Sequence, residues 1–134
     1  MQNRIHRVDI TERAQDLLRR IIEDNGPVLF RQSRHGDDEQ APVCLPITRV
    51  PIEQADRMLG RLNWHTEFWL SADQYEHCKH SHLTVDVTRG EAAADSLDAG
   101  RGLRFVVRAR SLTEAENAAL ADIPPPRTGA DRTL

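Results

Sequence analysis

TERAQDLLRRIIEDNGPVLFRQS, residues 11–33, joins a helix pattern to a strand pattern through a single Gly-Pro pair. Apolar residues in its first part recur three and four positions apart, which predicts an amphipathic helix over residues 11–25. These residues are Ala14, Leu17, Leu18, Ile21 and Ile22. Thr11 can cap this helix by accepting an amide hydrogen, and Gly26-Pro27 ends it. The apolar run that follows predicts a strand over residues 28–33.

The rest of the chain has mainly strand patterns. Residues 82–87 alternate, with Leu83, Val85 and Val87 on one face. A further strand is expected at 103–109, shorter extended pieces at 43–50 and 66–70, a short helix capped by Ser71 at 71–79, and a loop at 88–102. Residues 52–62 fit either a helix or an extended segment. One helix followed by a mostly antiparallel sheet predicts the α+β class.

The domain boundary is expected near residue 112. A chain of 134 residues has room for one core, so residues 1–112 are predicted to form a single α+β domain. Residues 113–122 are rich in Ala and Glu and predict a short helix. Three consecutive prolines begin at Pro124. The segment 113–134 is therefore expected to be a short helix and a flexible, disordered Pro-rich tail.

Composition and charge exclude several classes of protein. The net charge of -3, with both signs interspersed, gives no reason to expect a nucleic-acid or membrane-surface partner. No apolar run approaches the roughly 20 residues that cross a bilayer. Two cysteines are too few for a disulfide framework, and the sequence starts without the apolar segment of a secretory signal. A cytoplasmic protein is expected.

Residues 76–82, EHCKHSH, are the densest group of potential metal ligands. They contain three of the six histidines and one of the two cysteines. On a helix, Glu76 and His80 lie one turn apart, as do His77 and His80; on a strand, His80 and His82 share a face. Neutral imidazole and thiolate favour zinc, iron or copper. The alternative is a set of exposed histidines at the end of a helix.

A second polar cluster, residues 35–39, follows the first strand and leads to Cys44. It offers an imidazole from His35 and carboxylates that include Asp38. Loops that a sheet holds in place are common functional sites. Acidic runs, however, are usually solvated turns, and a single cysteine is usually a small buried hydrophobe. A shared metal site requires this loop and the segment 77–82 to meet in space.

Aromatic and arginine side chains suggest two further sites, each with a simpler explanation. Trp64, Phe68, Trp69 and Tyr75 gather in one short region, where core packing is favoured over a ligand-stacking wall. The arginines at 104, 108 and 110 can clamp a carboxylate or phosphate, but strand arginines more often cover a sheet. No dinucleotide fingerprint, phosphate loop or nucleophile elbow accompanies them.

Several of these stretches resemble a small bacterial family, domain of unknown function 779, over about residues 14–110. The matching stretches are GPVLFRQS (26–33), PVC (42–44), SADQYE (71–76) with Lys79-His80, VDV (85–87), and GLRF (102–105) with RAR (108–110). Members of this family often lie beside aldehyde dehydrogenase genes. The order of helix, strand, polar loop and sheet is also similar to the HesB-like iron-sulfur carrier fold, in which loop cysteines bind iron or a cluster.

The resemblance also bears on the ligand set. The family usually has a cysteine pair after Gln32-Ser33, and here Gly36 and Asp37 occupy those positions. A site of mixed His, Asp and Cys ligands is still implied. Its metal ligands would be Asp38, Cys44 and His80 from matched positions, together with His35 and His77, which are particular to this chain.

Two functional hypotheses follow. The first is a small metal-binding protein, or a metalloenzyme, that holds one transition-metal ion, zinc or iron, with Glu76 and Asp38 as the nearest proton carriers. The alternative for this site is that the protein binds no metal. The sequence does not identify a small-molecule substrate. The second, implied by the family's gene neighbourhoods, is a non-catalytic accessory protein that docks on an aldehyde dehydrogenase or a related oxidoreductase. A homodimer through a sheet edge is compatible with both.

Overall fold

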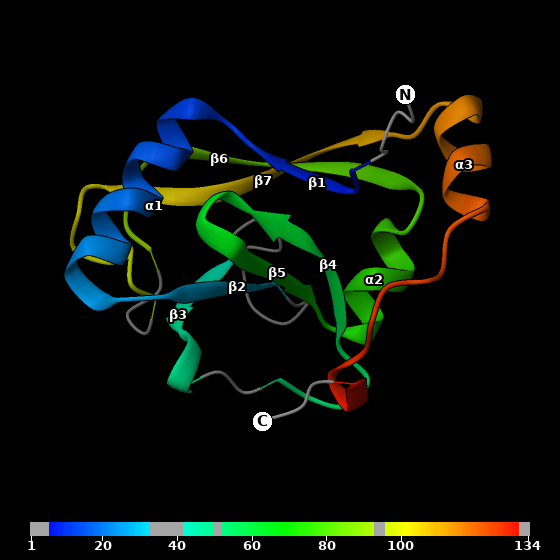
Figure 1. The fold of residues 1–134 in the computed structure, drawn as a ribbon. Coiled ribbons are helices and arrows are strands. Elements are labelled where there is room, and N and C mark those ends of the chain that lie inside the picture. The colour runs from blue at the N-terminus through cyan, green and yellow to red at the C-terminus, as the bar shows by residue number, and fades with distance from the viewer. Residues whose placement is uncertain (1–5, 33–41, 50–51, 93–95, 132–134) are drawn as a thin grey trace.

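Two β-sheets and three α-helices make up the described part of the computed structural model, which covers residues 6–32, 42–49, 52–92 and 96–131 (Figure 1). The helices are α1 (Glu12–Asn25), α2 (Ala72–Cys78) and α3 (Glu114–Ala121). The strands are β1 (Val8–Ile10), β2 (Val28–Gln32), β3 (Val43–Pro46), β4 (Arg57–Leu62), β5 (Thr66–Leu70), β6 (Ser81–Arg89) and β7 (Leu103–Ser111). Among the residues described, no helix is both long and apolar enough to cross a membrane.

The two sheets have the strand orders β1-β6-β7 and β3-β2-β5-β4. Each contains one parallel pair, β1 with β6 and β2 with β5, and the other pairs are antiparallel. The α+β class is therefore confirmed. The single sheet expected from the sequence is instead two mixed sheets.

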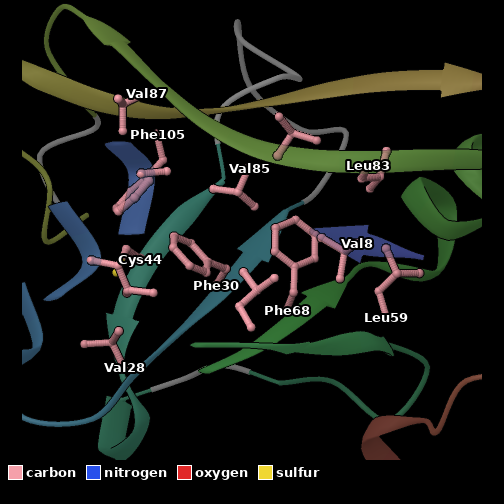
Figure 2. Packing of buried hydrophobic residues seen from close by; sticks show 14 of the residues in the cluster. Val8, Val28, Phe30, Cys44, Leu59, Phe68, Leu83, Val85, Val87 and Phe105 are labelled. Carbon is pink, nitrogen blue, oxygen red and sulfur yellow. The ribbon is translucent and has the colours of Figure 1, made fainter. Parts of the chain in front are cut away.

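The hydrophobic core lies between the facing sheets (Figure 2). Phe30 of β2 is fully buried and packs edge-on against Phe105 of β7, with the ring centroids 4.8 Å apart. It also contacts Phe68 of β5, at a centroid distance of 5.9 Å. Three aromatic rings from both sheets thus hold the layers together. Loss of one such ring costs about 3 to 5 kcal/mol of stability.

Helix α1 forms as predicted. The Thr11 hydroxyl accepts a hydrogen bond from the Ala14 amide at 3.2 Å, and Gly26 ends the helix with a φ of 79°, a conformation that suits glycine. The buried face consists of Ala14, Leu17, Leu18 and Ile21. This face packs on the core cluster that the two sheets form.

Strands β4 and β6 and helix α2 can be compared with what the sequence predicted for their residues. Residues 57–62, within the ambiguous segment, form strand β4 and pair with β5. Helix α2 begins after Ser71, whose hydroxyl accepts from the Gln74 amide at 3.2 Å. Strand β6 buries Leu83, Val85 and Val87 as expected, and His82 and Asp86 of its opposite face are buried as well.

The C-terminal segment begins with the predicted helix, α3, which a capping box of Thr113 and Glu116 starts. Beyond it, the Met58 amide donates to the Arg127 carbonyl at 2.8 Å, and the Gly129 amide donates to the Asp56 carbonyl at 2.9 Å. The sequence predicted no such contacts. This part of the Pro-rich tail is attached to the domain, and residues 132–134 lie outside the described residues.

Candidate functional site

Cys44, a predicted metal ligand, lies inside the core on β3 and is fully buried (Figure 2). Its amide donates to Ser96 Oγ at 2.9 Å, and its carbonyl accepts from the Leu97 amide at 2.8 Å. Burial raises the pKa of the Cys44 thiol, and the nearby Asp98 carboxylate raises it further. Because a metal binds the thiolate, these surroundings favour a packing role for Cys44.

The predicted histidine ligands lie at the end of α2 and just after it. His77, in the last turn, and His80, between α2 and β6, are both exposed. Glu76, a predicted proton carrier, is also exposed and pairs with Lys79 at 2.7 Å. That contact lowers the pKa of the Glu76 carboxyl. Glu76 is thus an ionised surface group at neutral pH.

The other predicted site residues, His35 and Asp38, lie outside the described residues. Within the described ranges, no group of three or more His, Cys, Asp and Glu side chains could hold a metal ion. The mixed His, Asp and Cys site is therefore still a prediction, and Cys44 is the member whose surroundings fit it least.

A cavity of about 260 Å³ lies where β2 ends, between α2 and the strands β6 and β7. We call it the amide-thiol cavity. Its lining residues are Gln32, Gln74, His77, Cys78, Ser81, Leu83, Val107 and Ala109. The cavity is at the carboxyl end of the parallel strands β2 and β5, the edge where ligands bind in many sheets with parallel strands.

Gln74 and Cys78 form a hydrogen-bonded pair in the wall of this cavity. The Gln74 side-chain amide donates from Nε2 to Cys78 Sγ at 3.1 Å, and the Cys78 thiol donates to the Gln74 backbone carbonyl at 3.0 Å. Gln74 is only 5% exposed, and its side-chain oxygen Oε1 has no hydrogen-bond partner among the described residues. A buried polar atom in this state requires an explanation, and a bound cation or donor group is one.

Sequence reasoning noticed Cys78 within the histidine cluster but omitted it from the ligand set, and it considered Gln74 only as a partner of the Ser71 cap. A signal was present, because residues four apart on a helix lie on the same face. Gln74 and Cys78 have this spacing on the helix that Ser71 caps. The family resemblance favoured Cys44 instead.

The remaining candidates are mostly structural. His82 is buried, and its Nε2 lies 2.9 Å from a carboxylate oxygen of Asp9. Phe68 and Trp69 belong to the core, as the favoured explanation predicted, whereas Trp64 is 51% exposed on a left-handed backbone with a φ of 60°. Trp64 is thus the large exposed aromatic side chain of this region.

Comparison with known proteins assigns the chain to a family. A family model described as "Domain of unknown function (DUF779)" matches residues 17–111. No curated protein and no solved structure matches the chain significantly. The likeness to the HesB-like fold and the association with aldehyde dehydrogenase therefore stay predictions. The match spans most of the chain, from helix α1 to the end of strand β7, and we conclude that this protein belongs to the DUF779 family of domains of unknown function.

Proposed function

We propose that this protein binds one transition-metal ion at the amide-thiol cavity, with the Cys78 sulfur and the His77 imidazole as ligands. The observation that carries the proposal is that Cys78, His77 and Gln74 line one cavity, and that the buried side-chain oxygen of Gln74 has no hydrogen-bond partner among the described residues. Sulfur and nitrogen ligands favour zinc, iron or copper over magnesium or calcium. The proposal keeps the mixed His and Cys character expected from the sequence and replaces Cys44 with Cys78.

The number of ligands decides how tightly an ion is held. Zinc takes four ligands in most protein sites, and catalytic sites keep one position for water. Gln74 lines the same cavity, and its unpartnered Oε1 is the proposed third donor atom. His35 and Asp38 follow Gln32, another lining residue, in the sequence, so they are the next side chains to test.

The chemistry available to such a site depends on how many coordination positions of the metal ion the protein leaves open. An ion with one bound water lowers the pKa of that water and supplies a hydroxide near neutral pH. A cavity of about 260 Å³ accommodates water and a compound of a few heavy atoms. The metalloenzyme form of the proposal therefore implies a very small substrate.

The test is calorimetric titration of the metal-free protein with zinc alone. We expect uptake of about one ion per chain, and a loss of affinity of at least about tenfold in Cys78→Ser and in His77→Ala. Serine keeps the hydrogen bonds of Cys78 with Gln74 but is a poor zinc ligand. A loss of zinc affinity in this variant therefore reports the loss of a ligand and not a loss of the fold. His35→Ala and Asp38→Ala then show whether the loop contributes.

Cys44→Ala and His80→Ala are the matched controls. Each removes a residue of the same type that does not line the cavity. Zinc affinity should stay within about twofold in both, because neither change alters the proposed donor set. A wild-type protein that takes up no zinc would contradict the proposal, and so would a Cys44→Ala variant as defective as Cys78→Ser.

Docking on an aldehyde dehydrogenase is the second candidate, and one observation favours it. Trp64 projects about half of its surface into solvent from a left-handed turn between β4 and β5. Exposed tryptophans are frequent anchors in protein interfaces. The proposal predicts that Trp64→Ala abolishes co-purification with an aldehyde dehydrogenase. Unchanged co-purification of the variant, or none by the wild-type protein, would count against docking through this residue.

A further inference from the structure

A second cavity, of about 470 Å³, lies between helix α1 and the strands β6 and β7. Four arginines line it: Arg13 and Arg20 of α1, Arg89 of β6, and Arg108 of β7. We call it the arginine groove. Its position differs from that of the amide-thiol cavity, since none of its lining residues is shared with that cavity. The arginine groove is therefore a separate place on the molecule from the proposed metal site.

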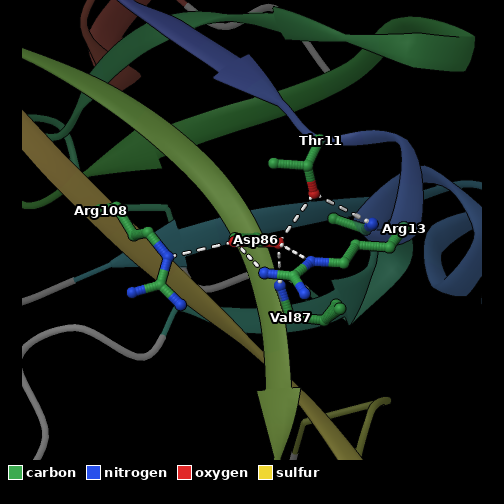
Figure 3. A network of polar contacts seen from close by, with 6 residues as sticks. Thr11, Arg13, Asp86, Val87 and Arg108 are labelled. Carbon is green, nitrogen blue, oxygen red and sulfur yellow. Dashed lines mark hydrogen bonds and ion pairs between the residues drawn. The ribbon is translucent and has the colours of Figure 1, made fainter.

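Asp86 of β6 fixes two of the four guanidinium groups (Figure 3). Its carboxylate accepts two hydrogen bonds from Arg13, both at 2.7 Å, and one from Arg108 at 3.1 Å. The Thr11 hydroxyl and the Val87 amide also donate to it, at 2.9 and 2.8 Å. The Arg13 guanidinium and these other donors hold the pKa of Asp86 well below its usual range. The carboxylate is thus a permanent anchor at neutral pH.

This anchoring leaves donors available in the groove. A guanidinium carries five N–H groups. Arg13 uses two of them on Asp86, and Arg108 uses one. The side chains of Arg20 and Arg89 make no hydrogen bond or ion pair with any described residue. The residues that line this cavity thus include two arginines that Asp86 orients and two that have no such contact within the described part of the chain.

The charge of the groove is opposite to that of the whole protein. The net charge of the chain is -3. The groove has four arginines against Asp16, which also lines it, and the buried Asp86, which leaves two positive charges in excess. Positive charge gathered at one place favours an anionic ligand there. A polyanion that covers a wide surface is disfavoured, because the protein as a whole is negatively charged.

The floor of the groove is apolar. Leu17 and Val87 are almost completely buried there. The volume falls within the range of small-molecule sites, about 300 to 1,000 Å³. A ligand that fits both features has an anionic group for the arginines and a short carbon skeleton for the floor.

We infer that the arginine groove binds a small organic oxyanion, a compound that carries phosphate or carboxylate on a short carbon skeleton. Planar guanidiniums form paired hydrogen bonds with both groups. Asp86 positions Arg13 and Arg108 before the ligand arrives, and Arg20 and Arg89 complete the contacts.

The experiment is calorimetric titration of the full chain, in a buffer without divalent metal, with inorganic phosphate, glycerol 3-phosphate and succinate. These probes distinguish free phosphate, a phosphate ester and a dicarboxylate. We expect glycerol 3-phosphate or succinate to bind, and Arg20→Ala and Arg89→Ala each to weaken that binding about tenfold, as the loss of a charge-assisted hydrogen bond does. Binding of inorganic phosphate alone would overturn the inference, because phosphate has no carbon skeleton. Neither arginine contacts Asp86, so both variants should fold, which thermal unfolding checks.

Arg19→Ala is the matched control. Arg19 is an exposed neighbour of Arg20 on α1 and does not line the groove. Its replacement by alanine removes the same charge as Arg20→Ala. The affinity of the Arg19→Ala variant for the bound probe should stay within about twofold of that of the wild-type protein. Binding that Arg19→Ala weakens as much as Arg20→Ala would reflect general charge attraction and overturn the inference. Failure of all three probes to bind at millimolar concentration would overturn it as well.

Discussion

Cys44 and Cys78 are both buried thiols, 0% and 7% exposed, yet their surroundings differ. Cys44 lies in the apolar core, and only its backbone is hydrogen-bonded to the loop at Ser96 and Leu97. The Cys78 thiol has polar contacts with Gln74 and lines a cavity beside His77. Two cysteines of similar burial can therefore differ in chemistry, because the neighbours of a thiol decide whether it reaches a ligand.

Thiol reactivity should show the largest contrast between the two cysteines. With iodoacetamide under native conditions, we expect Cys78 to react at least about 100-fold faster than Cys44, since Cys44 needs opening of the core and a raised pKa keeps its thiol protonated. Mass spectrometry of peptides after timed quenching measures the two rates. Equal rates would remove the distinction on which the proposed metal site rests.

Stability should separate the two serine variants by a smaller amount. Cys44→Ser places a hydroxyl in the apolar core and should cost about 2 kcal/mol of the free energy of unfolding. Cys78→Ser keeps the hydrogen bonds with Gln74 and should cost less than about 1 kcal/mol. Urea unfolding at neutral pH measures both. A larger loss of stability in Cys78→Ser than in Cys44→Ser would contradict the difference in surroundings between the two cysteines.

Alkaline pH should reveal the raised pKa of Cys44. An unfolded cysteine titrates near pH 8.5, whereas the buried thiol stays protonated to higher pH, so unfolding releases a proton. The stability that this neutral thiol contributes is complete below about pH 8.5 and falls as the pH rises. Its loss approaches about 1.4 kcal/mol per pH unit.

Cys44→Ala lacks this group and should lose less stability than wild type between about pH 8.5 and 10. Urea unfolding across this range, with a reducing agent present, gives the two slopes. Parallel slopes for the two proteins would mean that Cys44 is not the titrating group.

Local patterns predicted much of the fold. Helix α1, its Thr11 cap and its Gly26 end were readable because a helix and its caps depend on neighbours in sequence. The same holds for α2 after Ser71 and for the alternation in β6. Division into two sheets was not readable, because it depends on pairs such as Val8 with Leu83, which lie far apart in the chain.

The candidate sites were only partly predictable for the same reason. One residue of the histidine cluster, His77, lines the amide-thiol cavity. The cavity itself needs β6 and β7 to pack beside α2, which no local pattern encodes. The arginine groove likewise depends on Asp86, which joins Arg13 and Arg108 from separate elements. Sequence reasoning considered Arg108 but had no signal for the other three.

Protection of the two thiols by zinc is the most direct test of the central claim, that Cys78 and not Cys44 faces a metal site. The full chain is treated with iodoacetamide, with and without saturating zinc, and each cysteine is followed by mass spectrometry. The account predicts that zinc slows alkylation of Cys78 at least about tenfold and leaves the slow rate of Cys44 unchanged. Alkylation of Cys78 at the same rate in both conditions would contradict it.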